Sequence, residues 1–281
     1  MVAALSAPHQ KILAVSADDE PWIMSAEGAG VAPFSSLHEV ANPVICGNFI
    51  VATSYPSGPA ETVQARAHGE KPRKLASGRL IWEASYQFGP ADIVRVDADG
   101  LNLTKLASGL VYSPTCSPDG KFVFYVLMTH PQKILRVPIE GGNPVEIGTI
   151  PGPTVRGTMR ISPDGRFLAF PFDQYDPKPA IKLAVVPVKQ GAAVRIFDAP
   201  AGIYRESCLR WSPDGKGLQY LLTVGDVTNI WEQRLTGGGP RHVTTFTSGR
   251  IFDFNWTADG KKLLLSRGEV KSDVVLLSNL R

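Results

Sequence analysis

Four aspartates recur at one position of a repeated turn, and they form the set of acidic residues most suggestive of chemistry. Asp119 follows Ser-Pro and precedes Gly, and two further copies repeat this sequence, while Thr257-Ala258-Asp259-Gly260 is a variant. A repeated carboxylate could act as a base or a metal ligand. However, a type I turn favours Pro at its second position, tolerates Asp at its third and accepts Gly at its fourth. We therefore interpret the repeated pair as structural turn residues: Asp119, Gly120, Asp164, Gly165, Asp214, Gly215, Asp259 and Gly260.

The other residue types that often act in catalysis do not form a known catalytic or metal-binding motif in this sequence. The histidines are scattered, with no pair at metal-ligand spacing. A serine peptidase of the α/β-hydrolase type needs a Gly-x-Ser-x-Gly elbow, which does not occur in the sequence. A glycosidase needs two facing carboxylates, and the sequence identifies no such pair. We therefore expect no enzymatic activity, no cofactor and no bound metal. The histidines are His9, His38, His68, His130 and His242.

The spacing of the turns predicts the architecture that carries these residues. Their first residues step by 45, 50 and 45 positions, from residue 117 to residues 162, 212 and 257. Strand-like sequence flanks each turn, as in residues 121–127, so each turn is predicted to close a β-hairpin. A second link, such as residues 137–142, follows each hairpin and completes four antiparallel strands. A period in the forties with this content is typical of β-propeller blades.

The first half of the chain carries a weaker form of the repeat. Residues 47–55 align with residues 78–86 at an offset of 31, which is short for four strands and their turns. We expect the blade between them to lack its innermost strand. Residues 11–15 and 22–25 look like the middle strands of another unit.

The strand count predicts one closed ring. Residues 251–256, 263–265 and 274–277 supply three strands of the last unit and no fourth, and a segment such as residues 1–5 would complete it. The fold class is therefore all-β. We predict a single β-propeller domain over residues 1–281 with four-stranded antiparallel blades, seven in number with six as the alternative, one of them short of a strand.

Composition narrows the function further. The chain has 281 residues, is 43% hydrophobic and has a formal net charge of +3 with scattered basic residues, so we expect no nucleic-acid partner. No apolar run approaches the ~18 residues of a membrane span. The first nine residues lack a charged segment and a long apolar run, so we expect no secretion signal there.

The three cysteines do not form a spaced framework. Cys46 and Cys116 stand just before their turns, in the register held elsewhere by Ile161, Trp211 and Trp256, a position that packs between blades. We interpret them as buried apolar thiols. A disulfide is the alternative in an oxidising compartment, although an odd number of cysteines, Cys208 included, argues against a scaffold of bridges.

The repeat resembles that of the TolB-type propellers, relatives of the Trp-Asp-repeat propellers. Their unit runs Trp-Ser-Pro-Asp-Gly-Lys, an apolar strand, a loop and Ile-Trp-x-x-x-Leu-x-Gly-Gly. Residues 211–238 match it nearly position for position, and the resemblance extends over residues 92–281. It implies the propeller fold and a periplasmic or extracytoplasmic location, which conflicts with the absence of an export signal in the first residues.

The last part of the chain has a narrower resemblance. Residues 250–256 and 272–277 are similar to the propeller that ends bacterial receptor-like serine/threonine kinases and winged-helix regulators. The sequence holds neither a glycine-rich nucleotide loop nor a His-Arg-Asp loop, so it has no kinase domain. We expect either a free-standing propeller or the detached sensor domain of a longer kinase or regulator.

Three arginines are predicted to converge on the variable face of the ring. Arg156, Arg205 and Arg250 precede their turn Ser or Thr by 6, 7 and 7 residues, which places them near the mouth of the central channel. Converging guanidiniums would bind an acidic partner through bidentate hydrogen bonds. Alternatively, each arginine pairs with a local acid, such as Glu206 or Asp253. Nearby aromatic rings would offer a flat contact surface or fill the channel rim; they are Tyr112 and Tyr204.

We predict a non-catalytic module that binds another protein or an acidic ligand through this variable face. The chain contains no predicted membrane span, and we expect no nucleic acid among its partners. A hydrolase or lyase at the channel mouth is the alternative from another class, and it predicts clustered carboxylates or a bound metal there.

Overall fold

The structure is a computed structural model built of β-strands. It describes residues 2–6, 11–15, 21–25, 32–33, 40–46, 49–54, 62–64, 73–76, 91–97, 102–155, 157–175, 177–189, 191–200, 203, 209–257 and 259–269. Regular structure in these residues is entirely strand. Accordingly, the described part of the chain offers no long apolar helix of the kind that crosses a membrane.

Two four-stranded antiparallel sheets form the N-terminal part and are named blades 1 and 2. Blade 1 has the order β1-β2-β3-β4, and blade 2 has the order β5-β6-β9-β10. A separate hairpin, β7 with β8, lies between β6 and β9 in sequence. The strands are β1 (Val2–Ser6), β2 (Lys11–Val15), β3 (Pro21–Ser25), β4 (Ala32–Pro33), β5 (Val40–Cys46), β6 (Phe49–Ser54), β7 (Thr62–Gln64), β8 (Arg73–Ala76), β9 (Ala91–Asp97) and β10 (Thr104–Gly109).

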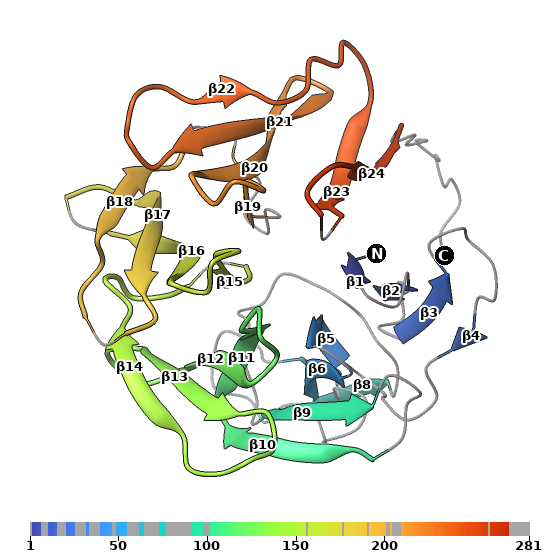
Figure 1. Ribbon diagram of the computed structural model, residues 1–281, viewed down its shortest axis with the longest axis vertical. Coiled ribbons are helices and arrows are strands. Elements are labelled where there is room, and N and C mark those ends of the chain that lie inside the picture. The colour runs from blue at the N-terminus through green and yellow to red at the C-terminus, as the bar shows by residue number, and fades with distance from the viewer. Residues whose placement is uncertain are drawn as a thin grey trace.

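Blades 3, 4 and 5 are four-stranded sheets in sequential order, and blade 6 is the pair β23-β24. Figure 1 shows the blades arranged around a common centre, with the first strand of each blade innermost. Their strands are β11 (Val111–Cys116), β12 (Phe122–Leu127), β13 (Lys133–Pro138), β14 (Val145–Thr149), β15 (Arg160–Ile161), β16 (Phe167–Gln174), β17 (Ala180–Pro187), β18 (Arg195–Asp198), β19 (Arg210–Trp211), β20 (Gly217–Val224), β21 (Val227–Arg234), β22 (Arg241–His242), β23 (Arg250–Trp256) and β24 (Leu263–Gly268).

The core lies between neighbouring blades. Apolar side chains alternate along each central strand, so each sheet presents one apolar face to the blade before it and one to the blade after it. Between blades 3 and 4, Phe124 and Ile134 pack with Phe170. Between blades 4 and 5, Leu183 packs with Tyr220. Burial on both faces explains why β12, β16 and β20 are nearly continuous apolar runs.

Each Ser-Pro-Asp-Gly turn closes its hairpin through one repeated set of hydrogen bonds. In the first copy, the Gly120 amide donates to the Ser117 carbonyl at 2.9 Å, and Gly120 has a φ of 71°. The Ser117 hydroxyl donates to Asp119 Oδ1 at 2.6 Å and accepts from the Phe122 amide at 2.9 Å. The aspartate thus completes the turn with its own side chain, as the sequence interpretation requires.

Consecutive turns also touch one another. A Cβ at Gly165 would lie 3.3 Å from the ring of Pro118 in the preceding turn, and one at Gly260 would lie 2.7 Å from Pro213. Proline and glycine of neighbouring copies therefore pack together around the ring. This contact, added to the positive φ, is a second reason for glycine at the fourth position.

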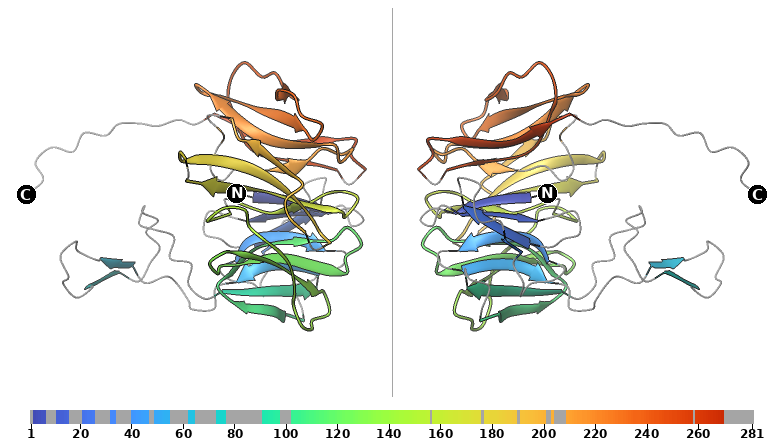
Figure 2. Two further views of the ribbon diagram at one scale, coloured as in Figure 1. Left: turned by 90° about the vertical axis from the view of Figure 1, so that its left-hand side faces the viewer. Right: turned by 90° about the vertical axis from the view of Figure 1, so that its right-hand side faces the viewer.

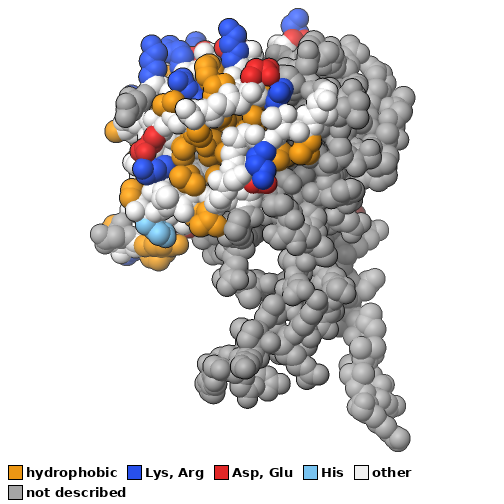
Figure 3. All heavy atoms as spheres, turned by 90° about the horizontal axis from the view of Figure 1, so that it is seen from below, with side chains coloured by type: hydrophobic (Ala, Val, Ile, Leu, Met, Phe, Trp, Pro, Cys, Tyr) orange, Lys and Arg blue, Asp and Glu red, His pale blue; other side chains and the backbone are white. Residues whose placement is uncertain are grey.

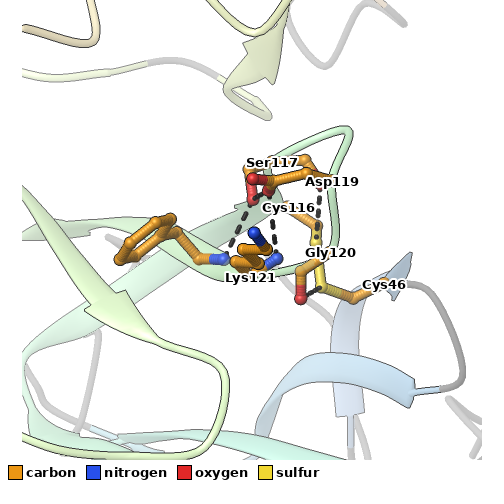
Figure 4. Close-up of a disulfide and its surroundings, with 7 residues drawn as sticks. Cys46, Cys116, Ser117, Asp119, Gly120 and Lys121 are labelled. Carbon is orange, nitrogen blue, oxygen red and sulfur yellow. Dashed lines mark hydrogen bonds between the residues drawn. A yellow bond between two sulfur atoms is a disulfide. The ribbon is translucent and has the colours of Figure 1, made fainter.

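Cys46 and Cys116 form a disulfide that joins blade 2 to blade 3 (Figure 4). Their Cα atoms are 5.5 Å apart, and 70 positions separate them in sequence. The interpretation of these residues as free buried thiols is therefore wrong, whereas their position between blades is as expected. The two residues stand at equivalent register positions in adjacent innermost strands, which brings their sulfur atoms together.

The same register position makes a non-covalent link in other blades. The indole nitrogen of Trp211 in blade 5 donates to the Arg160 carbonyl of blade 4 at 3.0 Å. The indole nitrogen of Trp256 in blade 6 donates to Gln219 Oε1 of blade 5 at 2.7 Å. The residue before the turn therefore ties each of these blades to its predecessor.

Residues 78–86, which align with residues 47–55 in sequence, lie outside the described residues, so the blade expected between the two segments stays a prediction. Strand β6 pairs directly with β9 from Phe49↔Asp97 to Ser54↔Asp92, so both belong to blade 2. The described strands give six blades, while residues 78–90 and 270–281, which include the expected strand at 274–277, lie outside the described residues. The predicted seventh blade is not among the strands described.

The N-terminal strand does not complete the last blade. β1 pairs with β2 from Val2↔Val15 to Ser6↔Lys11, so it is the innermost strand of blade 1, with β2 and β3 in the middle as expected. β1 lies next to β23 of blade 6 (Figure 1). The first and last blades therefore meet side by side, and the prediction of a shared sheet is wrong for β1.

Candidate functional site

The antiparallel order of each blade sorts its connections between two faces. The loop face, as we call it, carries the connection from the second to the third strand and the link that enters the next blade. The Met128 amide, for example, donates to the Leu110 carbonyl at 2.8 Å, which joins these two connections in blade 3. The Ser-Pro-Asp-Gly turns lie on the opposite face, here called the turn face.

Of the three arginines predicted at the channel mouth, the structure describes Arg250. Arg156 and Arg205 lie outside the described residues, as does Tyr204. Arg250 begins β23 on the loop face and is 40% exposed. Its Nη2 lies 2.9 Å from Oδ1 of Asp226 in the β20–β21 turn of blade 5. The partner is thus a local acid, as in the alternative interpretation, but it is neither Glu206 nor Asp253.

Tyr112 lies in the core, so it does not present a flat contact surface. The residue is 5% exposed, and its hydroxyl donates to Oε1 of the buried Gln132 at 2.9 Å. The same oxygen accepts from the Val155 amide at 3.2 Å. Gln132 therefore fixes Tyr112 to the link that enters blade 4, which corresponds to the second of the two roles considered for this ring.

Large apolar side chains are exposed on the loop face of four successive blades. Leu110 lies in the link that leads into blade 3, and Phe252 lies near the start of β23. Tyr175 and Val224 lie at the β16–β17 and β20–β21 connections. Their exposed fractions range from 40% for Leu110 to 69% for Val224. The sequence analysis missed this set because the exposure of these apolar side chains does not follow from residue type alone.

The outer edge of the ring has a different character. Figure 3 shows apolar side chains dispersed among lysines and arginines there. Val145 in β14 and Ile196 in β18 are exposed on outer strands. Because a soluble protein surface normally carries much apolar area, these scattered residues need no functional explanation.

A buried ion pair joins the innermost strands of blades 5 and 6. Nη2 of Arg210 in β19 lies 3.2 Å from Oδ1 of Asp253 in β23, and the two side chains are 9% and 5% exposed. Asp253 therefore pairs with Arg210 within the ring. The pair compensates for the burial of both charges and fixes two innermost strands relative to each other.

The turn face of blade 5 holds a polar cluster that the sequence analysis missed. Gln219, Glu232 and Arg241 are cross-strand neighbours on β20, β21 and β22. Glu232 Oε2 accepts from Gln219 Nε2 at 2.9 Å, and Oε1 accepts from Arg241 Nη2 at 2.8 Å and from Arg234 Nη1 at 3.0 Å. Arg234 Nη1 also donates to Asp214 Oδ2 at 3.0 Å, so the network reaches the turn.

Hydrogen bonding keeps both carboxylates of this cluster ionised. Burial raises the pKa of Glu232, but the bonds from Gln219, Arg234 and Arg241 outweigh burial and hold that pKa below its usual range. For Asp214, burial is likewise outweighed, and bonds from Ser212, the Lys216 amide and Arg234 lower the pKa to about 2.

A glycine makes room for the buried carboxylate. A Cβ at Gly217 would lie 2.9 Å from Glu232 Oε1. The described residues contain no group of three or more His, Cys, Asp or Glu side chains able to hold a metal ion.

Comparison with solved structures identifies the architecture. No protein-family model and no curated protein matches the sequence. The TolB structure from Agrobacterium tumefaciens superposes with a TM-score of 0.64 at 17% identity, covering 96% of this chain and 90% of that one. The chain has a TolB-type propeller fold. The resemblance to kinase- and regulator-linked propellers stays a prediction.

Propellers with different partners and activities share this fold. A structure from a nidogen–laminin complex has a TM-score of 0.56 at 10% identity, over 85% of this chain and 78% of that one. An acylaminoacyl peptidase from Pyrococcus horikoshii has a TM-score of 0.53 at 13% identity, over 83% of this chain but 36% of the peptidase. At these identities the likeness describes the fold and leaves function to the site itself.

Proposed function

We propose that the chain is a non-catalytic interaction module that binds another protein through its loop face. The observation that carries this proposal is the set of exposed apolar side chains on four successive blades: Leu110, Tyr175, Val224 and Phe252. Apolar and aromatic anchors surrounded by polar groups are characteristic of protein interfaces. Since the blades form a rigid support, a partner would meet these anchors without a large rearrangement of the ring.

Charged groups at the edge of this surface would orient the partner. Arg250 and Asp226 form an exposed ion pair beside Val224. In this proposal Arg156 and Arg205, which the repeat places at corresponding positions, add positive charge and favour a partner with an acidic segment. The nidogen–laminin complex supports the proposal as a case in which a propeller of similar fold occurs in an assembly with another protein.

A binding experiment with two matched variants tests the proposal. The full chain carrying Tyr175→Ser and Val224→Ser would be immobilised beside the wild type and a control carrying Val145→Ser and Ile196→Ser on the outer edge. Proteins captured from the native host would be identified, purified and titrated against all three forms. We expect the purified partner to bind the wild type and the control equally and the loop-face variant at least about 10-fold more weakly, because two anchors are lost. Equal affinity for all three forms would contradict the proposal.

The charge of the partner requires a separate comparison. Replacing Arg156, Arg205 and Arg250 together by Ala is expected to slow association of an acidic partner and to reduce its dependence on salt concentration. Unchanged association rates at low and high salt would exclude the arginine rim while leaving the apolar anchors to be judged by the first experiment.

We also propose that the protein works in an oxidising, extracytoplasmic compartment. The support is the Cys46–Cys116 disulfide, since such bonds persist mainly outside the reducing cytosol. Alkylation of free thiols in freshly lysed native cells is expected to modify neither Cys46 nor Cys116. Modification of both residues without prior reduction would contradict this location.

A further inference from the structure

A hollow on the turn face lies between blades 5 and 6, away from the proposed interaction surface. Its volume is about 370 Å³. Pro213, Val243 and Trp256 contribute apolar walls, and the buried side chains of Gln219 and Glu232 lie at its base. The remaining lining residues are polar or charged: Ser212, Asp214, Arg234, Arg241 and His242.

The base of this hollow departs from the pattern of the other blade interfaces. The row Gln219, Glu232 and Arg241 corresponds in register to Phe124, Arg136 and Val145 of blade 3. In blade 4, the corresponding row is Ala169, Val185 and Arg195.

Both other rows bury an apolar residue where Gln219 stands, and neither contains a carboxylate. Burying Gln219 and Glu232 costs desolvation that apolar residues would avoid. Such departures from a repeated structural pattern are expected at functional sites.

The hydrogen bonds within the cluster use much of the acceptor capacity of Glu232 but leave guanidinium N–H donors available to a ligand. Glu232 already accepts three bonds, from Gln219, Arg234 and Arg241. Among the described residues, Arg241 bonds through Nη2 and Arg234 through Nη1. Their other guanidinium N–H groups can therefore donate to a ligand, and the Arg241 side chain is 63% exposed at the rim.

The rim is held in a defined position. The His242 ring stacks on Trp231 with 3.6 Å between ring centroids, and His242 Nδ1 lies 3.2 Å from the Thr244 carbonyl oxygen. Arg241 is adjacent to His242 and is tied to the buried carboxylate of Glu232. A ligand would thus find its donors oriented in advance, which lowers the entropic cost of binding.

We propose that this hollow binds a small organic carboxylate, whose oxygens accept from Arg241 and Arg234 while its ring or apolar part packs against Trp256 and Pro213. A carboxylate offers acceptors alone and matches guanidinium geometry. The two arginines and two acids of the hollow balance in charge, which favours a singly charged ligand over a doubly charged phosphate. The apolar walls favour an organic group beside the charge. Both an acidic sugar and the C-terminus of a peptide have this chemistry.

Titration of the purified full chain with two pairs of probes tests the proposal. The first pair is glucuronate and glucose, and the second is N-acetylphenylalanine and its amide; within each pair only one member carries a carboxylate. The indole N–H resonance of Trp256, assigned from a Trp256→Phe variant, reports binding at the site itself. We expect at least one carboxylate to shift this resonance saturably and its uncharged analogue to leave it unchanged. The pair that responds distinguishes a sugar ligand from a peptide terminus.

Matched arginine variants locate the binding. Arg241→Ala is expected to weaken binding at least about 10-fold through loss of a charge-assisted hydrogen bond. Arg195→Ala, at the corresponding position of blade 4, should bind as the wild type does. Arg241→Lys keeps the charge near Glu232 and serves if Arg241→Ala unfolds; it too should bind more weakly because lysine lacks the planar fork. Saturable binding to neither carboxylate, equal binding of the uncharged analogues, or unchanged affinity in every folded Arg241 variant would overturn the proposal.

Discussion

At the scale of single residues, the turn aspartates combine a structural role with a measurable electrostatic one. In each copy the hydroxyl of Ser or Thr donates to the aspartate, at distances between 2.5 Å and 2.6 Å. These bonds favour the ionised form and lower the pKa of Asp119, Asp164, Asp214 and Asp259. The residues that first suggested catalysis are thus explained by local turn geometry.

The lowered pKa of Asp214 predicts how its contribution to stability depends on pH. Because the pKa of Asp214 is about 2 in the folded protein and 3.8 is the ordinary value for an aspartate, the contribution is fully present above about pH 4 and is lost as pH falls towards 2. We expect Asp214→Asn to reduce the unfolding free energy by about 0.5–1 kcal/mol at neutral pH, given the exposure of the group. Chemical denaturation from pH 2 to pH 7 measures the difference, which should shrink below pH 4. A constant difference would show that ionisation plays no part.

The Arg210–Asp253 pair predicts a larger effect. Asp253→Ala leaves a buried guanidinium without this partner, and we expect a loss of about 3–5 kcal/mol in unfolding free energy. The double variant Arg210→Met with Asp253→Leu removes both charges and is expected to lose less than the single variant. Urea denaturation of the three proteins checks this order, and a double variant as unstable as Asp253→Ala would argue against a charge effect.

At the scale of elements, the links between blades determine which interfaces hold most firmly. The bond between Cys46 and Cys116 replaces the indole hydrogen bonds that Trp211 and Trp256 make at the corresponding position. A covalent link at this point constrains the unfolded chain over a separation of 70 positions. Blade 2 is therefore attached to blade 3 even if its packing loosens.

Removal of this disulfide is expected to lower stability by about 2–4 kcal/mol. The variant with Cys46→Ser and Cys116→Ser should melt at a lower temperature than the wild type and should not respond to reducing agent. Cys208→Ser is the matched control and should melt as the wild type does under oxidising and reducing conditions. An equal effect of reductant on all three proteins would contradict the assignment of the stabilising bond.

Features that depend on residues close together in sequence were predictable, whereas features that depend on contacts between distant strands were not. The turns and hairpins of blades 3 to 5 depend on neighbours within a few residues, such as Ser117 and Asp119, and were predictable. The disulfide and the row from Gln219 to Arg241 depend on which strands lie side by side, which residue spacing does not reveal. The pairing of β6 with β9 was not predicted for the same reason, since the two strands are far apart in sequence.

At the scale of the whole molecule, the junction between blades 1 and 6 differs from the others. β1 lies beside β23 but pairs with β2, so the described strands share no sheet across this junction, and blades 1 and 6, unlike the other neighbouring blades, are not consecutive along the chain. The all-β class and the propeller architecture were predicted correctly, because the repeat period and the strand-like sequence recur in several copies along the chain. The closure was predicted wrongly at β1, because residues 2–6 had their own neighbour in residues 11–15.

This arrangement predicts that the ring opens more readily between blades 1 and 6 than between blades 3 and 4. We expect the amides of β1 and β23 to exchange with deuterium faster than those of β12 and β16, because blades 1 and 6, unlike blades 3 and 4, are not consecutive along the chain, and a junction without such a link opens at lower free energy. Hydrogen exchange followed by mass spectrometry measures this difference. Slower exchange in β23 than in β16 would show that the ring opens elsewhere.

The pairing of β6 with β9 has a practical consequence for protein engineering. These strands keep an uninterrupted register although 36 residues, numbers 55–90, separate them in sequence. The entropy of loop closure changes slowly with loop length, so making this long connection longer is expected to cost the sheet little stability. The junction after Ser54 is therefore a natural place to splice in a foreign peptide or reporter, while the scaffold around it retains its own pairing.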